Sequence, residues 1–182
     1  MLLTIPHRRS KCAGVEIRLN GNVLAQVQKS RYPGIAIDES LKWGDQFASV
    51  ERKVYAGIAC INRAKHGLNS SERTGLYNAF VQPHLDYCAP VWSAATEEMR
   101  RRMGVVQRKV LQAMLDYPMR PRNNEELYAR CRVTEIEERW RNQDAVWLYR
   151  IVSNDPSVPT YLKETIKFTL RHEDVQEDRV QL

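Results

Sequence analysis

Lysine and arginine side chains next to a glycine-containing turn are candidates for contact with a nucleic-acid backbone. Lys29 and Arg31 immediately precede Tyr32-Pro33-Gly34. The two cations can neutralise phosphates, and a glycine, which has no Cβ, lets another backbone approach closely. An edge strand that ends in a turn and carries solvated charges gives the same pattern. Both alternatives stay open, with Lys29, Arg31, Tyr32 and Gly34 as the candidate contacts.

A second set of cations belongs to a long helix predicted after Trp43. Apolar residues there recur every three or four positions, which is the spacing of one face of an α-helix. The cations lie off that stripe, where they could follow a duplex or form an ordinary solvated face. The apolar stripe is Phe47, Val50, Val54, Ile58 and Ile61, and the cations are Lys53, Arg63 and Lys65.

The positive charge of the chain is unevenly distributed. The net charge is +6, from 28 Lys/Arg and 22 Asp/Glu. Residues 1–65 hold eleven Lys/Arg against five Asp/Glu, and residues 66–122 hold eight against five. Residues 123–182 hold nine against twelve. A polyanionic partner is therefore expected to contact the first two thirds of the chain.

The segment around His84, Asp86 and Cys88 places a thiol near an imidazole, the pair of groups that a thiol hydrolase uses. Prolines and aromatic residues surround these side chains, which favours packing over catalysis. The four cysteines lie far apart, and neither they nor the four histidines have the spacing of a zinc site. We expect reduced thiols and no catalytic or metal-ligating residue in this chain.

The first forty residues have the pattern of short strands. Met1–Ile5 is an apolar run, and Val15–Leu19 alternates apolar and charged residues. Asn20-Gly21 follows, which is a strong signal for a two-residue hairpin turn. A further strand is predicted over Tyr32–Asp38. Because Pro33 has no N–H to donate, this strand is either at an edge or begins late.

Helices are predicted for most of the remaining chain. Prolines interrupt it at Pro83 and Pro90. We predict an α+β fold that is mainly α, with a small antiparallel β-hairpin region followed by a bundle of about five helices. The helices after the first are predicted to begin near residue 72, Thr96, Asn123 and Thr134.

No apolar stretch approaches the roughly 18 residues of a membrane span, so an intracellular protein, nuclear or cytoplasmic, is expected.

One segment resembles a known protein family. Phe80-Val-Gln-Pro-His-Leu-Asp-Tyr-Cys-Ala-Pro-Val-Trp92 is similar to the "lv.PhLdYcspvW" segment of LINE-type (non-LTR, jockey-like) retrotransposon reverse transcriptases. In that family the segment lies past the polymerase active site. Other features follow in the family's order over roughly residues 1–165. They are Met1–Ile5 for the last palm strand, Val15–Val27 for a hairpin, Tyr32-Pro33-Gly34 for a Tyr-Leu-Gly motif, Leu41-Lys42-Trp43 for a Leu-x-Trp turn, Val50–Gly67 for the thumb, and Val158–Leu162 for an "aPpYL" element.

The resemblance implies how the chain is organised. Residues 1–43 would be end-of-palm strands and a primer-grip-like hairpin, and residues 44–116 thumb-like helices. Residues 117–165 would be a post-thumb helical region, and residues 166–182 a charged, flexible tail. The implied partners are an RNA/DNA template–primer duplex, bound weakly through the first two thirds, and the palm and fingers of a parent polymerase. No membrane partner is expected.

The resemblance also implies what this chain lacks. Polymerases of the family hold two metal ions with aspartates, one of them in a Tyr-x-Asp-Asp hairpin, and Mg²⁺ is the ion expected in the parent polymerase. No Asp-Asp occurs in this sequence, so we expect no cofactor in this chain and no activity from it alone. Pro33 replaces the leucine of Tyr-Leu-Gly and removes an N–H from the primer-grip-like turn. The alternative is a helical protein-interaction module with no nucleic-acid role.

Overall fold

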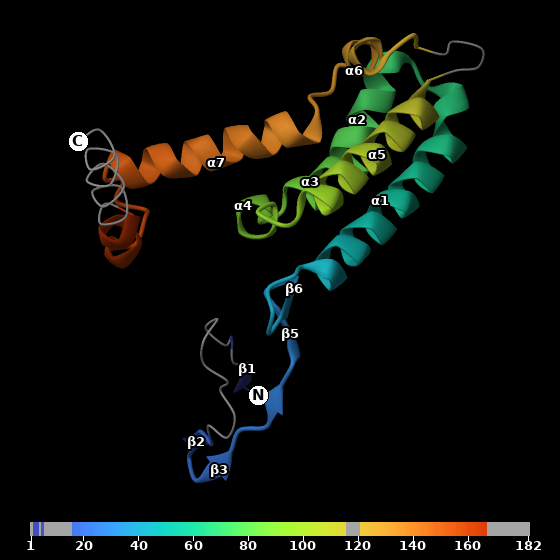
Figure 1. Ribbon diagram of the computed structural model, residues 1–182. Coiled ribbons are helices and arrows are strands. Elements are labelled where there is room, and N and C mark those ends of the chain that lie inside the picture. Colours follow the sequence, from blue (N-terminus) through green and yellow to red (C-terminus); the bar gives the residue numbers. More distant parts are fainter. Residues whose placement is uncertain (1, 4, 6–15, 116–120, 167–182) are drawn as a thin grey trace. The chain divides into compact units, whose positions relative to one another are not determined.

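The computed structural model describes residues 2–3, 5, 16–115 and 121–166 of the chain (Figure 1). The chain divides into two compact units, Met1–Glu137 and Glu138–Leu182, and each is described by itself. The predicted strand Met1–Ile5 is described only in part. The predicted tail over 166–182 lies, apart from its first residue, outside the described residues, and so does Val15.

Short strands form the beginning of the larger unit. β2 (Arg18–Leu19) and β3 (Asn22–Val23) make the hairpin predicted at Asn20-Gly21. The two turn residues have φ angles of 51° and 79°, both positive as a type I′ turn requires. β1 (Leu2–Leu3) pairs in parallel with β4 (Gln26–Val27).

A second hairpin leads into the helices. β5 (Lys29–Tyr32) pairs antiparallel with β6 (Ile35–Asp38), and Tyr32 lies opposite Ile35. The predicted strand Tyr32–Asp38 therefore begins late, because Pro33 and Gly34 form the turn. Proline fixes its own φ angle, and Gly34 has a φ of 87°, which favours glycine. The polar sequence of β5 has no alternating apolar residues, so periodicity does not predict it.

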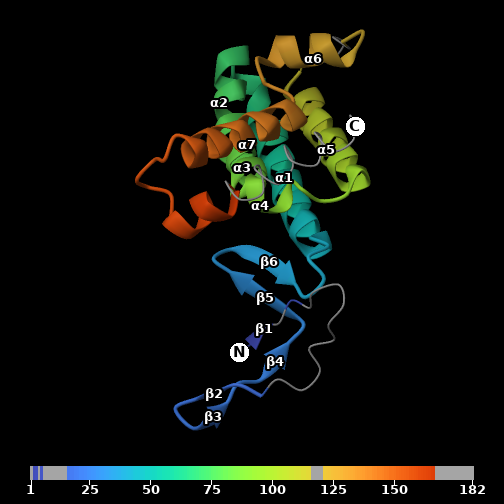
Figure 2. The same ribbon diagram turned by 60° about the vertical axis from the view of Figure 1, so that its left-hand side comes forward.

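Three helices form the centre of the larger unit. α1 (Gly44–Ala64), α2 (Ser70–Phe80) and α5 (Glu97–Met114) lie side by side in both views (Figures 1 and 2). A 3₁₀ turn, Lys65–Gly67, follows α1. The predicted apolar stripe of α1 is confirmed as core, since four of its five side chains are buried and Ile58 is half-buried.

The backbone of α1 passes very close to the segment that follows α2. A Cβ on Gly57 would lie 2.7 Å from Cγ2 of Val81 and 3.3 Å from the carbonyl oxygen of Phe80. Glycine has the lowest helix propensity of any residue except proline, by roughly 1 kcal/mol relative to alanine. Close helix packing explains why this residue stands inside a long helix.

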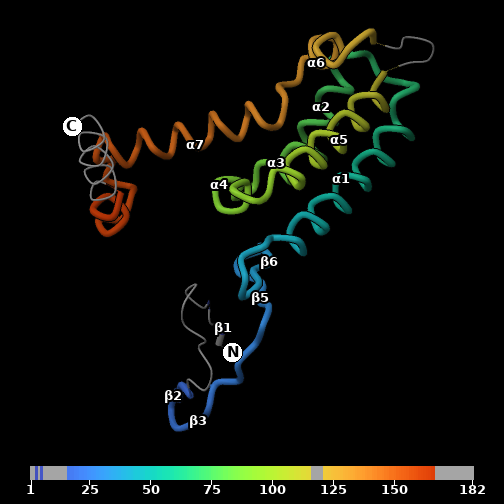
Figure 3. Tube along the Cα trace, viewed as in Figure 1, coloured from blue at the N-terminus to red at the C-terminus, as the bar shows by residue number. Residues whose placement is uncertain are grey.

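Figure 3 shows the other labelled helices. They are α3 (Gln82–Asp86), α4 (Ala89–Trp92), α6 (Asn124–Cys131) and α7 (Ile136–Val152). The predicted α+β, mainly α, class is confirmed. The described residues hold eight α-helical segments, counting one over residues 160–166, rather than about five. One reason is that Pro83 and Pro90 each lie in the first turn of a short helix. Proline is tolerated there, since the first N–H groups of a helix have no intrahelical partner.

The smaller unit contains most of α7 and a helical stretch over residues 160–166. Asp155 accepts hydrogen bonds from the backbone N–H and the hydroxyl of Ser157, at 2.8 and 2.7 Å, and so fixes the turn after α7. The buried Lys163 donates its Nζ to the carbonyl oxygen of Asn154 at 3.2 Å.

The aromatic segment that ends at Trp92 contacts the β5–β6 turn. The Tyr87 hydroxyl donates a 2.6 Å hydrogen bond to the carbonyl oxygen of Pro33, and its ring would lie 3.5 Å from a Cβ on Gly34. Trp92 donates its Nε1 to the carbonyl oxygen of Tyr87 at 2.9 Å. The Trp92 ring also meets Phe47 edge to face, with centroids 5.1 Å apart. A side chain anchored in the helical core therefore holds the hairpin turn.

Gln107 on α5 is a polar side chain with no exposed surface at the centre of the larger unit. Its Nε2 donates to the Tyr77 hydroxyl at 2.9 Å and to the carbonyl oxygen of Thr134 at 3.0 Å. Its Oε1 accepts from the N–H of Ile136 at 2.9 Å and from the Tyr128 hydroxyl at 3.2 Å. All four hydrogen-bonding positions of the amide are used.

Replacing Gln107 by leucine should destabilise the larger unit by several kcal/mol. The change leaves the buried N–H of Ile136 without its partner, at a cost of about 1–3 kcal/mol, and removes three further hydrogen bonds of the amide. Urea denaturation followed by circular dichroism measures the difference. Gln112→Leu, on an exposed position of the same helix, is the matched control. Equal midpoints for the two variants would contradict the buried role of Gln107.

Replacing Tyr87 by phenylalanine should loosen the β5–β6 hairpin while leaving the helices folded. The variant keeps the ring beside Gly34 but loses the hydrogen bond to Pro33, a net contribution of about 1 kcal/mol or less at this half-exposed site. Hydrogen exchange should be faster for amides of Lys29–Asp38 only. Tyr149→Phe, a more exposed tyrosine on α7, is the control and should leave the hairpin amides unchanged.

Candidate nucleic-acid interface

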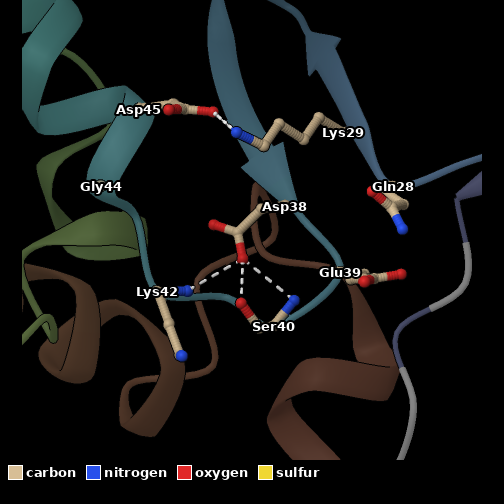
Figure 4. Close-up of a pocket in the computed structure, with 8 residues that line it drawn as sticks. All are labelled: Gln28, Lys29, Asp38, Glu39, Ser40, Lys42, Gly44 and Asp45. Carbon is tan, nitrogen blue, oxygen red and sulfur yellow. Dashed lines mark hydrogen bonds and ion pairs between the residues drawn. The ribbon is translucent and has the colours of Figure 1, made fainter.

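The turn over residues 39–43, here called the Asp38 corner, joins β6 to α1 and is fixed by hydrogen bonds to Asp38. The Asp38 carboxylate accepts hydrogen bonds from the backbone N–H groups of Ser40 and Lys42, at 3.0 and 3.3 Å, and from the Ser40 hydroxyl (Figure 4). It also accepts one from the N–H of Trp43 at 3.1 Å. The Ser40 hydroxyl, followed by these backbone donors, lowers the pKa of Asp38. Leu41 and Trp43 have φ angles of 51° and 62°, which non-glycine residues seldom adopt. The carboxylate stabilises this strained turn.

The first turn of α1 contacts the hairpin at a second point. Ala36 lies opposite Arg31 in a pair whose N–H groups point away from the partner strand. The N–H of Ala36 donates instead to Oε1 of the buried Gln46, at 3.0 Å. Together with the Asp38 corner and the Tyr87 contact, this bond fixes the hairpin against the helices.

Lys29 and Arg31, two of the predicted contacts, lie on one face of β5, because side chains two residues apart in a strand point the same way. Lys29 forms an ion pair with Asp45 at the start of α1, with Nζ and Oδ2 2.7 Å apart (Figure 4). The hydrogen bond to Asp45 raises the pKa of Lys29, so the lysine stays charged at neutral pH. Its charge is offset by that of Asp45.

Two hollows in the surface share the residues of this ion pair. One, of about 260 Å³, is lined by Asp38, Ser40 and Lys42 among others, and appears in Figure 4. The other, of about 350 Å³, is lined by Arg31 on β5 and by Arg52 on α1. Both include Lys29 and Asp45 in their walls.

The turn residues are placed where a ligand can reach them. Tyr32 is 73% exposed, and Gly34 is exposed apart from its contact with Tyr87. Four of the seven predicted contacts therefore lie on one small hairpin, which the helical core holds in place.

The three predicted cations of the first helix do not share a face. At about 100° per residue, Arg63 lies roughly 80° around the helix axis from Lys53, and Lys65 roughly 120° in the opposite direction. Lys53 and Arg63 are exposed. Lys65 is half-buried and donates its Nζ to the carbonyl oxygen of Ala113 at 3.2 Å. That carbonyl is one of the unpaired groups at the end of α5, so Lys65 caps this helix.

Arg52 lies at the candidate interface beside Arg31 but is not among the contacts predicted from the sequence. Asp45, Ala48, Ser49 and Arg52 follow the spacing i, i+3, i+4, i+7, which defines a second stripe on α1 away from the core. That spacing was present in the sequence. What periodicity does not show is that β5 lies beside this stripe.

Other cations of the larger unit have partners in the fold. Arg102 forms an ion pair with Glu51 on α1, and Arg101 with Glu98. Lys109 donates to the Tyr55 hydroxyl at 3.1 Å, with its Nζ 5.6 Å from the ring centroid. The contacts of Arg102 and Lys109 join α5 to α1, whereas the Arg101–Glu98 pair lies within α5, so these cations have structural roles.

His84 and Cys88 show no arrangement for nucleophilic chemistry. Among the described residues, no hydrogen bond joins the two side chains, and Asp86 accepts one from Gln82 at 2.7 Å. Burial, and then the charge of Lys53, lower the pKa of His84. Cys88 has a φ of 52° and precedes α4, and its segment packs against the core.

The described residues contain no group of three or more His, Cys, Asp or Glu side chains that could hold a metal ion. Asp38 and Asp45, beside the hollows, are engaged by backbone N–H groups and by Lys29. These residues do not fit the Mg²⁺ site of a polymerase. No helix in the described part of the chain is long and apolar enough to cross a membrane.

Comparison with known proteins gives three relatives, all from fruit-fly mobile elements. The chain is 30% identical over 100 residues to a putative 115 kDa protein in the type-1 retrotransposable element R1DM of Drosophila melanogaster. It is 28% identical over 119 residues to the RNA-directed DNA polymerase from mobile element jockey of Drosophila funebris. It is 26% identical over 106 residues to a probable RNA-directed DNA polymerase from transposon BS of Drosophila melanogaster.

The matches cover 52%, 63% and 56% of this chain and 10%, 13% and 12% of the relatives. The chain thus spans about a tenth of the length of the curated relatives it matches. Neither a family model nor a solved structure matches it. These comparisons support, over more than half of the chain, the resemblance to proteins of LINE-type, jockey-like retrotransposons.

Proposed function

We propose that this chain is the thumb region, with adjoining segments, of a retrotransposon RNA-directed DNA polymerase, and that it holds a template–primer duplex. The observation that supports this most is the placement of the β5–β6 hairpin. An exposed glycine turn flanked by Lys29 and Arg31 is fixed at the start of a long helix. The names of the relatives agree with a polymerase origin.

The proposed contacts are of two kinds. Phosphates would be neutralised by the exposed cations, and the turn would let the backbone of the primer approach Gly34 closely. Lys65 acts differently, because it holds the end of α5 and so stabilises the helices that carry the other contacts. The contacts to the duplex are Lys29, Arg31, Tyr32, Gly34, Lys53 and Arg63.

Catalysis is assigned to the rest of the parent polymerase. Its palm and fingers would supply the carboxylates and the Mg²⁺ that join nucleotides, and would be the protein partners of this chain. The carboxylates of Asp38 and Asp45, beside the hollows, have structural roles. We propose that this chain alone has no polymerase activity.

One observation favours a second function, a helical protein-interaction module. α7 carries a run of exposed apolar side chains, which is uncommon on a surface that contacts only water. A second protein would cover them. The residues are Val146, Trp147, Leu148, Tyr149 and Val152, each 45% exposed or more.

The chain should bind an RNA–DNA hybrid duplex with an affinity that falls steeply with salt. Changing both Lys53 and Arg63 to alanine should lower the slope of log K against log salt by nearly two, at roughly 0.9 per lost phosphate contact. Fluorescence anisotropy of a labelled 20-base-pair hybrid measures the slope. Arg122→Ala with Arg132→Ala removes the same charge from two exposed positions around α6 and should change it little. Salt-independent or undetectable binding would favour the interaction module.

The purified chain should incorporate no deoxynucleotides on a primed RNA template with Mg²⁺ or Mn²⁺. The reason is that the sequence has no Asp-Asp pair. In addition, the carboxylate of Asp38 already accepts hydrogen bonds from backbone N–H groups. An active reverse transcriptase in the same assay is the positive control. Incorporation above that of a buffer blank would show that the chain carries a complete active site.

A further inference from the structure

The hollow between β5 and α1 has the composition of an anion site. It measures about 350 Å³ and opens to solvent. Its walls include the cations Arg31 and Arg52 and the hydroxyl-bearing Ser49. Ala36 and Ala48 are the small residues between them, and they leave room for a group to enter.

The charge in this hollow is not balanced by the fold. Lys29 and Asp45 neutralise each other through their ion pair. Among the described residues, neither Arg31 nor Arg52 has a carboxylate within ion-pair distance. Two guanidinium groups from two different elements therefore share one hollow with a surplus of positive charge. Guanidinium groups bind phosphate oxygens through paired N–H donors, which an ammonium does less well.

The stripe of α1 that lines the hollow continues along the helix. Beyond Arg52 it carries Ala56 and Ala59, both exposed, and then Arg63. At 1.5 Å per residue, Arg63 lies about 16 Å from Arg52 along the axis. Small side chains between two arginines let a long, thin ligand lie close to the helix, whereas a compact ligand would reach only one of them.

We propose that this hollow is a seat for a phosphodiester group of a nucleic-acid strand, with Arg31 and Arg52 as its paired donors and Arg63 as the next contact along the strand. The proposal rests on the proposed function and adds to it a residue, Arg52, and a path for the ligand. The same phosphate chemistry is offered by a free small anion such as pyrophosphate. The continuation of the stripe to Arg63 favours the polynucleotide.

Changing both Arg31 and Arg52 to glutamine tests the seat. The labelled RNA–DNA hybrid is titrated with the wild-type chain and the double variant at several salt concentrations. The expected result is a salt slope lower by nearly two than that of the wild type. Arg132→Gln, at an exposed position beyond α6, is the control and should leave the slope unchanged. Arg52→Lys should keep the salt slope, because the positive charge is kept. It should weaken binding of the hybrid, because an ammonium lacks the paired N–H donors of a guanidinium. Thermal melts of each variant confirm folding.

The outcomes separate this proposal from the one on which it rests. If the wild type binds the hybrid and the folded double variant keeps the wild-type slope, the seat is overturned and the proposed function stands. If the wild type binds no hybrid, both are overturned. Pyrophosphate at equal ionic strength should not displace the hybrid. Its displacement at micromolar pyrophosphate would identify a small-anion site and overturn the polynucleotide seat.

Discussion

The amide of Gln107 is the interaction on which the helical part of the molecule depends. A buried amide that loses any partner costs free energy, so an arrangement that satisfies all four positions is favoured over packings that satisfy fewer. Its partners come from α2, from α6, from Thr134 two residues before α7, and from the first residue of α7. Apolar packing alone tolerates sliding of one helix on another, whereas these directed bonds do not. The amide therefore determines the register in which α5 presents its other face to α1.

The orientation of α1 then determines the surface. Its core face is buried against α5 and α2, with Gly57 permitting the closest approach. The opposite stripe, which carries Arg52 and Arg63, consequently faces outward beside the hairpin. The hairpin contributes few apolar contacts of its own, and its position depends on polar bonds from Asp38, Gln46 and Tyr87. The candidate interface thus combines this hairpin with the outward stripe of α1, and the buried face of α1 holds both in place.

Local sequence patterns predict much of this fold and less of the interface. The stripe through Val50 and Val54 and the Asn20-Gly21 turn follow from helical spacing and from residues that accept positive φ angles. β5 does not follow, because its pairing with β6 depends on the turn at Pro33 rather than on apolar alternation. The capping role of Lys65 and the place of Arg52 depend on contacts between distant segments. A single sequence shows which cations are off the core, but not which of them lie together.

The Asp38 corner makes the attachment of the hairpin sensitive to acid. Because the folded chain lowers the pKa of this carboxyl group, protons bind it more weakly in the folded than in the unfolded state. Its stabilising effect is complete above the unfolded value, near 3.9, and is lost as pH falls through the lower folded value. Lys29, whose pKa is raised by its hydrogen bond to Asp45, remains protonated throughout that range. In strong acid the hairpin therefore loses the attachment made by Asp38, keeps those made by Gln46 and Tyr87, and keeps its positive charge.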